Sequence, residues 1–167
     1  MSALERFEVL KARQAHLRLF ALVDGWVFEQ QTGQPMAHAG GCESLFAGTE
    51  DAALADAGPW LVDAASQPEL CQRLRAQEAT APVVSWLITG VPLDGLVQLL
   101  RLKQDVRLPD GSTGLLRFYD PRVLDSLAGT LTGSQREDFF GHIHEWHFMR
   151  DGQALRIGRP SQGQLHA

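Results

Sequence analysis

The chain has 167 residues, of which 44% are hydrophobic and 21% are charged, so it has the composition of a globular domain and not of a disordered chain. At this length folding buries roughly 70% of the surface that the unfolded chain exposes, so neither a metal ion nor a disulfide is needed for stability. The formal net charge of -5 provides no general attraction to nucleic acid or to anionic membranes. We therefore expect neither as a partner.

The N-terminal half predicts helices that alternate with apolar strands. Ser2 and Glu5 form a capping box before apolar residues at helical spacing, which predicts a helix over about 3–15. Residues 17–23 are apolar at nearly every position, as in a strand that is covered on both faces. The later segments are a helix after Asp24, a short acidic helix near 49–56, an apolar segment over 59–62 and a helix over about 68–76.

The C-terminal half predicts a buried strand, several helices and two β-hairpins. The strand covers 83–89, and helices cover about 92–103, 121–127 and 134–140. The hairpins pair 106–108 with 115–119 and 143–149 with 154–157. We expect one domain over 1–157 with an α/β or α+β fold, a mixed sheet of about five to seven strands flanked by helices, and a flexible tail over 158–167.

The cysteines, the first residues and the most apolar stretch together predict the cellular compartment of the protein. Cys42 and Cys71 match no metal-ligand or redox spacing, which favours two buried free thiols in a reducing compartment. The first residues lack the basic patch and apolar run of a secretory signal. The most apolar stretch, 81–100, is interrupted by two prolines and an aspartate and is too broken to span a membrane. We expect a cytoplasmic protein.

A histidine-rich segment is the strongest metal candidate, through His142, His144 and His147. On a strand, His142 and His144 face one side, while Glu145 and His147 face the other. At most two imidazoles then converge, whereas a zinc site needs three or four donors. The spacing favours a half-exposed strand with a polar face, and we expect neither a metal nor another cofactor.

Asp24 and Asp120 end apolar strands, where α/β proteins often place catalytic groups. Each also fits a helix N-cap, and Pro121 after Asp120 strengthens the capping interpretation. The helix dipole disfavours Arg122 in a first helical turn, which predicts a carboxylate partner for it. The candidate partners are Asp120, Asp125 and Glu145.

Arg117 shares one face of the predicted strand with Tyr119, opposite Phe118, and is expected to pair with a carboxylate in the same way. The segment 117–122 therefore predicts a partly buried network of arginines and aspartates. Motifs for a serine nucleophile, a phosphate-binding loop or a dinucleotide are absent from the sequence, so no motif indicates an enzyme.

Several segments together resemble the adaptor domain of bacterial type VI secretion, also called the Tap or Tec adaptor chaperones and first catalogued as a domain of unknown function. They occur in the family's order and approximate spacing over about 18–148. The matching segments are residues 21–25, 44–49, 58–62, 108–111, 116–124 and the aromatic motif over 139–146. Arg-Phe-Tyr-Asp-Pro-Arg-Val-Leu, at 117–124, is the most specific of them.

The resemblance implies a non-enzymatic adaptor that binds a toxic effector in the cytoplasm and helps to load it onto the VgrG spike. It maps the family's motif residues onto Asp24, Arg117, Asp120 and Arg122. Larger members have a further C-terminal lobe, for which this chain has only a hairpin and tail.

Two other functions stay open at this point. One is a small metal-assisted hydrolase that uses Asp24, Asp120 and the three histidines. The other is a structural component of the secretion machine. For an adaptor, the acidic net charge predicts steering of a basic partner segment, an effect that weakens as salt rises.

Overall fold

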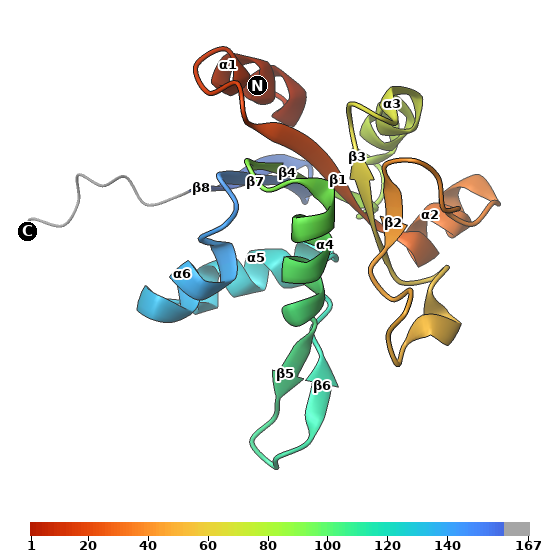
Figure 1. Ribbon diagram of the computed structural model, residues 1–167, viewed down its shortest axis with the longest axis vertical. Coiled ribbons are helices and arrows are strands. Elements are labelled where there is room, and N and C mark those ends of the chain that lie inside the picture. The colour runs from red at the N-terminus through yellow and green to blue at the C-terminus, as the bar shows by residue number, and fades with distance from the viewer. Residues whose placement is uncertain (159–167) are drawn as a thin grey trace, which may run out of the picture.

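The computed structural model describes residues 1–158, which form a central sheet with helices on both faces (Figure 1). The helices are α1 (Ala3–Lys11), α2 (Gly25–Thr32), α3 (Pro68–Gln77), α4 (Leu93–Leu102), α5 (Pro121–Thr130), α6 (Gly133–Phe140) and the 3-10 turn η1 (Ala52–Leu54). The main-sheet strands, in spatial order, are β2 (Cys42–Ser44), β3 (Pro59–Asp63), β1 (Arg18–Asp24), β4 (Val84–Thr89), β7 (Glu145–Arg150) and β8 (Gln153–Gly158). The fold class is α+β in a single domain, as expected.

Every strand pair in the described residues is antiparallel, so the expectation of mixed pairing was wrong. The helix α3 connects β3 to β4, and such a crossover makes the two strands run in the same direction. They are not neighbours, however, because β1 lies between them and pairs antiparallel with both. The strands on either side of α3 are therefore parallel in direction but separated by β1.

The sheet separates two hydrophobic cores, because side chains alternate along β1. Leu19, Ala21 and Val23 contribute to the core beneath α1, α2 and α3. Phe20 and Leu22 contribute to the core beneath α4, α5 and α6. The two groups of helices cover opposite faces (Figure 1). The fully buried pattern predicted for β1 is thus confirmed.

The predicted C-terminal hairpin is confirmed as β7–β8. Its turn residues Asp151 and Gly152 have φ values of 49° and 77°, the positive angles that a tight two-residue turn requires. The other hairpin joins β5 (Asp105–Arg107) to β6 (Thr113–Leu115) and projects away from the main sheet (Figure 1).

Several predicted boundaries differ from the structure. The first helix ends at Lys11, because the chain turns over residues 12–16 before it enters β1. The acidic helix near 49–56 is reduced to the single turn η1. Gly158, placed in the predicted tail, belongs to β8, and the rest of that tail, 159–167, lies outside the described residues.

None of the helices within residues 1–158 has the length and apolar character needed to cross a membrane.

Candidate protein-binding surfaces

The segment 116–120 is a loop and not the strand that the sequence predicted. The hydrogen bond from Asp120 N to Arg117 O, 3.0 Å long, closes a turn here. The Phe118 ring is fully buried and makes edge-on contacts with Trp146 and Phe139, at centroid distances of 6.0 and 5.7 Å. Core packing of this ring, together with a backbone hydrogen bond from Leu116 N to Gln104 O, therefore holds the loop in place.

Asp24 and Asp120 both cap helices, as predicted. Oδ1 of Asp24 accepts hydrogen bonds from the backbone N–H groups of Trp26 and Val27, each 3.1 Å long, at the start of α2. Oδ1 of Asp120 accepts one from Arg122 N, 2.9 Å long, at the start of α5. Each aspartate satisfies backbone donors that the first helical turn leaves unpaired.

The two arginines of the motif segment face these caps. Arg122 binds Asp120 through two parallel contacts, from Nη2 to Oδ2 at 2.8 Å and from Nε to Oδ1 at 3.0 Å. Arg117 Nη2 lies 3.9 Å from Asp24 Oδ2, and its guanidinium lies over the Tyr119 ring at 5.7 Å. The sequence-predicted arginine–aspartate network is present, with Asp120 as the partner of Arg122.

The environment shifts the pKa of the two carboxyl groups in opposite directions. Burial raises the pKa of Asp24, although it accepts hydrogen bonds from Val27 and Trp26 and lies near Arg117. Burial acts in the same sense on Asp120, but the hydrogen bonds and charge of Arg122 outweigh it and lower the pKa. The two side chains are only 3% and 10% exposed, so neither presents a free carboxylate at the surface.

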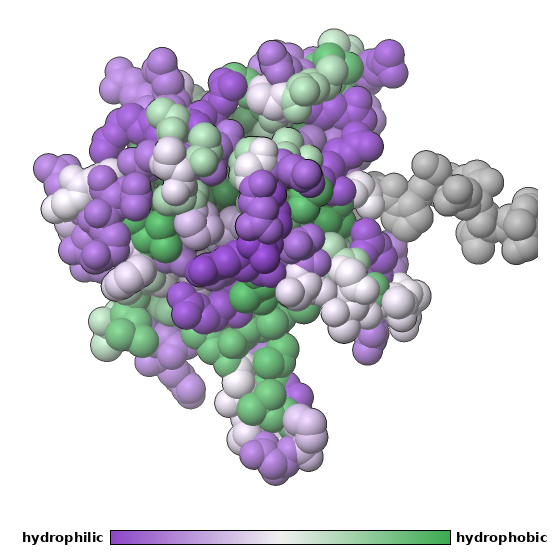
Figure 2. Space-filling view, turned by 180° about the vertical axis from the view of Figure 1, so that it is seen from behind, coloured by the Kyte–Doolittle hydropathy of each residue, from purple (hydrophilic) through white to green (hydrophobic). Residues whose placement is uncertain are grey.

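An open hollow of about 520 Å³, which we call the arginine groove, lies beside these residues. Large apolar side chains form much of its wall: Trp26 is 55% exposed, Leu54 59% and Leu115 42%. Arg117 and Arg122 supply its charged rim. Figure 2 shows hydrophobic side chains gathered over this lower part of the molecule and onto the base of the projecting hairpin. The exposure of Trp26, Leu54 and Leu115 was not predicted from the sequence.

Tight backbone packing fixes the wall of the arginine groove. Gly25 N and Trp26 N donate hydrogen bonds of 2.9 and 3.1 Å to the carbonyl groups of Gly58 and Ala57. Gly25 must be glycine, because a Cβ there would collide with backbone oxygen atoms of the facing segment. Arg101 of α4 binds the nearby loop through three carbonyl groups, those of Ser44, Leu45 and Ala47. The groove is therefore formed before any partner arrives.

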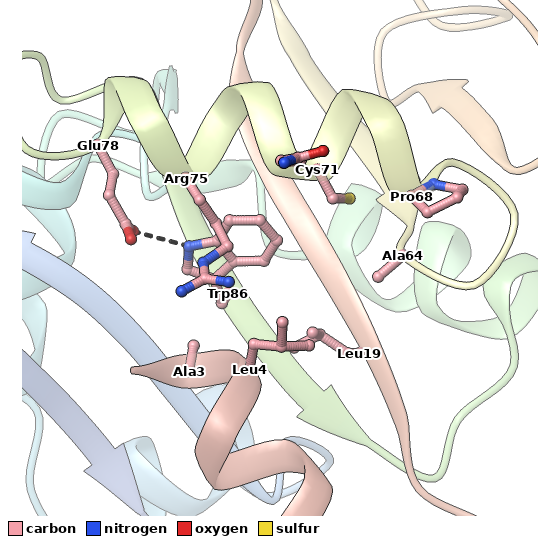
Figure 3. Close-up of a pocket in the computed structure, with 10 residues that line it drawn as sticks. Ala3, Leu4, Leu19, Ala64, Pro68, Cys71, Arg75, Glu78 and Trp86 are labelled. Atoms are coloured by element: carbon pink, nitrogen blue, oxygen red, sulfur yellow. Dashed lines mark hydrogen bonds between the residues drawn. The ribbon is translucent and has the colours of Figure 1, made fainter. Parts of the chain in front are cut away.

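A second hollow, the α1–α3 groove, lies between α1 and α3 over the face of the sheet (Figure 3). It has a volume of about 300 Å³, and Leu4, Leu19, Cys71 and Trp86 contribute to its apolar lining. At one end, Trp86 Nε1 donates a 2.8 Å hydrogen bond to Glu78 Oε2. A neighbouring hollow of about 440 Å³ shares Leu4 and Leu19 and extends the groove along α1.

The two cysteines are free and buried, as predicted. Burial raises the pKa of Cys71, in the α1–α3 groove, to about 12 and that of Cys42 to about 11. Neither thiol is therefore ionised near neutral pH, and thiolate chemistry is not favoured at either position.

The histidines do not assemble as the predicted strand would place them. β7 begins at Glu145, so His142 and His144 precede it and the expected alternation does not apply to them. Their backbone groups are tied to β4, because His142 O accepts from Thr89 Oγ1 and His144 N donates to Ile88 O. In residues 1–158, no group of three or more histidine, cysteine or acidic side chains is placed to hold a metal ion.

The histidine segment is also distant from the capping aspartates. Glu145 pairs with Ile88, which pairs with Leu19, five residues before Asp24 on β1. At about 3.3 Å per residue, this separation is roughly 17 Å along the strand. Of the histidines, His147 contacts Glu145 at 2.9 Å, so it lies with a different carboxylate from Asp24 and Asp120.

Comparison with known families identifies the chain. A family model described as "Domain of unknown function (DUF4123)" matches residues 19–138, which is more than two thirds of the chain. The chain belongs to this family. DUF4123 is linked with type VI secretion adaptors, and the matched region includes both capping aspartates and the whole arginine groove. No curated protein and no solved structure matches the chain.

Proposed function

We propose that this DUF4123 chain is a non-enzymatic adaptor. It binds a toxic effector in the cytoplasm and assists its loading onto the VgrG spike of a type VI secretion system. The observation that carries the proposal is the presence of two open apolar grooves at opposite ends of β1. The α1–α3 groove includes Leu19, near the start of β1, and the arginine groove includes Asp24, at its end. A protein with two separated surfaces of this kind can hold two partners at once.

The roles of the motif residues support binding over catalysis. A catalytic carboxylate needs an accessible oxygen that reaches the substrate. Asp24 and Asp120 instead accept backbone hydrogen bonds as caps and are almost completely buried. The surface beside them is apolar and aromatic, which is the composition of protein-binding hot spots.

Co-purification tests this proposal directly. The tagged chain is expressed with candidate effector and VgrG proteins from the same genome, and one of each is expected to be retained on the affinity resin. Leu54→Ser changes the arginine groove and Leu4→Arg the α1–α3 groove, so each variant is expected to release one partner and keep the other. Leu102→Ser is the matched control, because Leu102 is 79% exposed and lines neither groove. Failure of the unmodified chain to retain either partner contradicts the adaptor role.

An adaptor and a structural component of the machine differ in their fate. The adaptor stays in the cell while its effector leaves, whereas a structural component is present at a fixed ratio to the spike. Quantitative immunoblotting of secreted and cellular fractions is expected to find this chain only in the cells. Its appearance outside in proportion to VgrG would assign it to the machine.

A further inference from the structure

The tryptophans of this protein divide sharply by exposure. Trp60, Trp86 and Trp146 are at most 2% exposed, whereas Trp26 exposes 55% of its surface in the arginine groove. Leu54 and Leu115 line the same groove and are similarly exposed. An exposed tryptophan among other large apolar side chains, in a preformed hollow, is a typical anchor site for a partner's apolar side chain.

The charge that a partner meets at this groove is positive. The Asp24 and Asp120 side chains are 3% and 10% exposed, whereas the Arg117 and Arg122 side chains are 56% and 59% exposed. The N-terminal ends of α2 and α5 lie at the same place, but Asp24 and Asp120 already cap them, so the exposed arginines carry the positive charge of this rim. In a chain of net charge -5, this rim is a local exception.

Arg117 has donor capacity that its neighbours do not use fully. Its main partner is the Tyr119 side chain, and its Nη2 lies 3.9 Å from Asp24 Oδ2, which is beyond hydrogen-bond length. These contacts use only part of its donors. A guanidinium has five N–H donors in a flat fork that matches a carboxylate. Arg122, by contrast, is already bound to Asp120 through both arms. Arg117 is therefore the group that can donate hydrogen bonds to the carboxylate of a partner protein.

We infer that the arginine groove binds a partner segment in which a large apolar side chain stands next to an acidic side chain. The apolar side chain packs between Trp26 and Leu54, and the carboxylate binds the Arg117 guanidinium. This inference rests on the proposed adaptor function and specifies the partner chemistry at one of its two surfaces. It also reverses the expectation from net charge, because at this groove the preferred partner segment is acidic and not basic.

A selection with a random peptide library displayed on phage tests the inference. The complete chain is immobilised, and phage that also bind the Leu54→Ser variant are removed. The recovered peptides are expected to share a leucine, phenylalanine or similar residue adjacent to Asp or Glu. Binding of the synthetic peptides is then measured by titration. Leu102→Ser is the matched control for Leu54→Ser, and Arg13→Gln is the matched control for Arg117→Gln.

A double-mutant cycle tests the carboxylate contact. Arg117→Gln is expected to weaken peptide binding about tenfold, and replacing the acidic peptide residue by its amide is expected to weaken binding to the unmodified chain equally. The two changes together are expected to cost little more than either alone, because each removes the same contact. Arg13→Gln is expected to leave the affinity unchanged. Additive losses, recovered peptides without an acidic residue, or no recovered peptide each overturn the inference.

The fluorescence of Trp26 reports the position of binding. Because the other three tryptophans are buried, collisional quenching by acrylamide acts mainly on Trp26. Bound peptide is expected to protect it, and Trp26→Phe to abolish the quenchable signal. Peptide that binds without protecting Trp26 places the site elsewhere and overturns the inference.

The experiments distinguish failure of the groove assignment from failure of the proposed adaptor function. If the chain retains effector and spike but Arg117→Gln and Leu54→Ser change neither, the adaptor role stands and the groove assignment falls. If the groove selects acidic–apolar peptides but the chain retains neither partner, the assignment of the groove stands and the adaptor role falls.

Discussion

Arg6 in α1 binds Glu145 in β7 although 139 positions separate them in the sequence. Nη2 of Arg6 lies 2.6 Å from Oε1 of Glu145, and its Nε lies 3.0 Å from both carboxylate oxygens. His147 and Arg156 contact the same carboxylate at 2.9 and 3.3 Å. The Glu145 side chain is only 6% exposed. A nearly buried charge thus ties the first helix to the last hairpin.

Replacing Arg6 is expected to destabilise the protein. Arg6→Gln leaves the buried carboxylate with fewer partners, and we expect a loss of about 2 kcal/mol in the free energy of unfolding. Arg13→Gln, a nearby exposed arginine, is expected to change it by less than about 0.5 kcal/mol. Urea unfolding followed by circular dichroism measures both. Equal stability of the two variants would show that the contact contributes nothing.

The stability is expected to fall as the pH is lowered through the titration range of His147. Burial lowers the pKa of His147 below its ordinary value of 6.5, although Glu145 opposes this, while Arg156 and Arg6 add to it. Between the lower folded pKa and about 6.5, the unfolded chain binds a proton that the folded chain does not, so acidification favours unfolding.

The difference between two variants isolates this effect. The free energy of unfolding is measured from about pH 8 to about pH 5. Part of the decrease in the free energy of unfolding at low pH is expected to disappear in His147→Gln. It is expected to persist in His142→Gln, whose exposed side chain serves as the control. A His147→Gln profile parallel to that of the unmodified protein would contradict the assignment.

Two glycine substitutions are expected to change stability in opposite directions. An alanine Cβ at Gly25 would collide with the carbonyl oxygens of Asp56 and Gly58, so we expect Gly25→Ala to cost about 2 kcal/mol or more. Gly129 lies in α5 with open space around its Cβ position, and Gly129→Ala is expected to stabilise by about 0.5–1 kcal/mol. Thermal unfolding measures both, and a stable Gly25→Ala variant would refute the close packing of α2.

Asp24 offers a test of capping against catalysis. Asp24→Asn keeps an oxygen that can accept from Trp26 and Val27, so it is expected to retain nearly all stability and partner binding. Asp24→Ala is expected to lose about 1–2 kcal/mol. Urea unfolding and co-purification provide the two readouts. Full stability of the asparagine variant together with loss of function would argue for a chemical role of the carboxylate.

The features that were predicted well depend on neighbouring residues. Asp24 and Asp120 cap the helices that follow them, and Asp151 with Gly152 forms the hairpin turn. Each is a contact within about three residues, which the local sequence encodes directly. The wrong strand at 115–119 has the opposite cause, because the burial of Phe118 against Trp146 overrides its local strand preference.

The sequence by itself indicated one domain with an α/β or α+β fold, the buried β1, the helix caps and the motif that resembles the family. The tertiary structure decided that β1 separates β3 from β4, that Arg6 meets Glu145, and that Trp26, Leu54 and Leu115 converge beside Arg117. The physical reason is the range of the interactions. Caps and turns are set by backbone geometry over a few residues, whereas ion pairs and grooves depend on which strands pair and in what register.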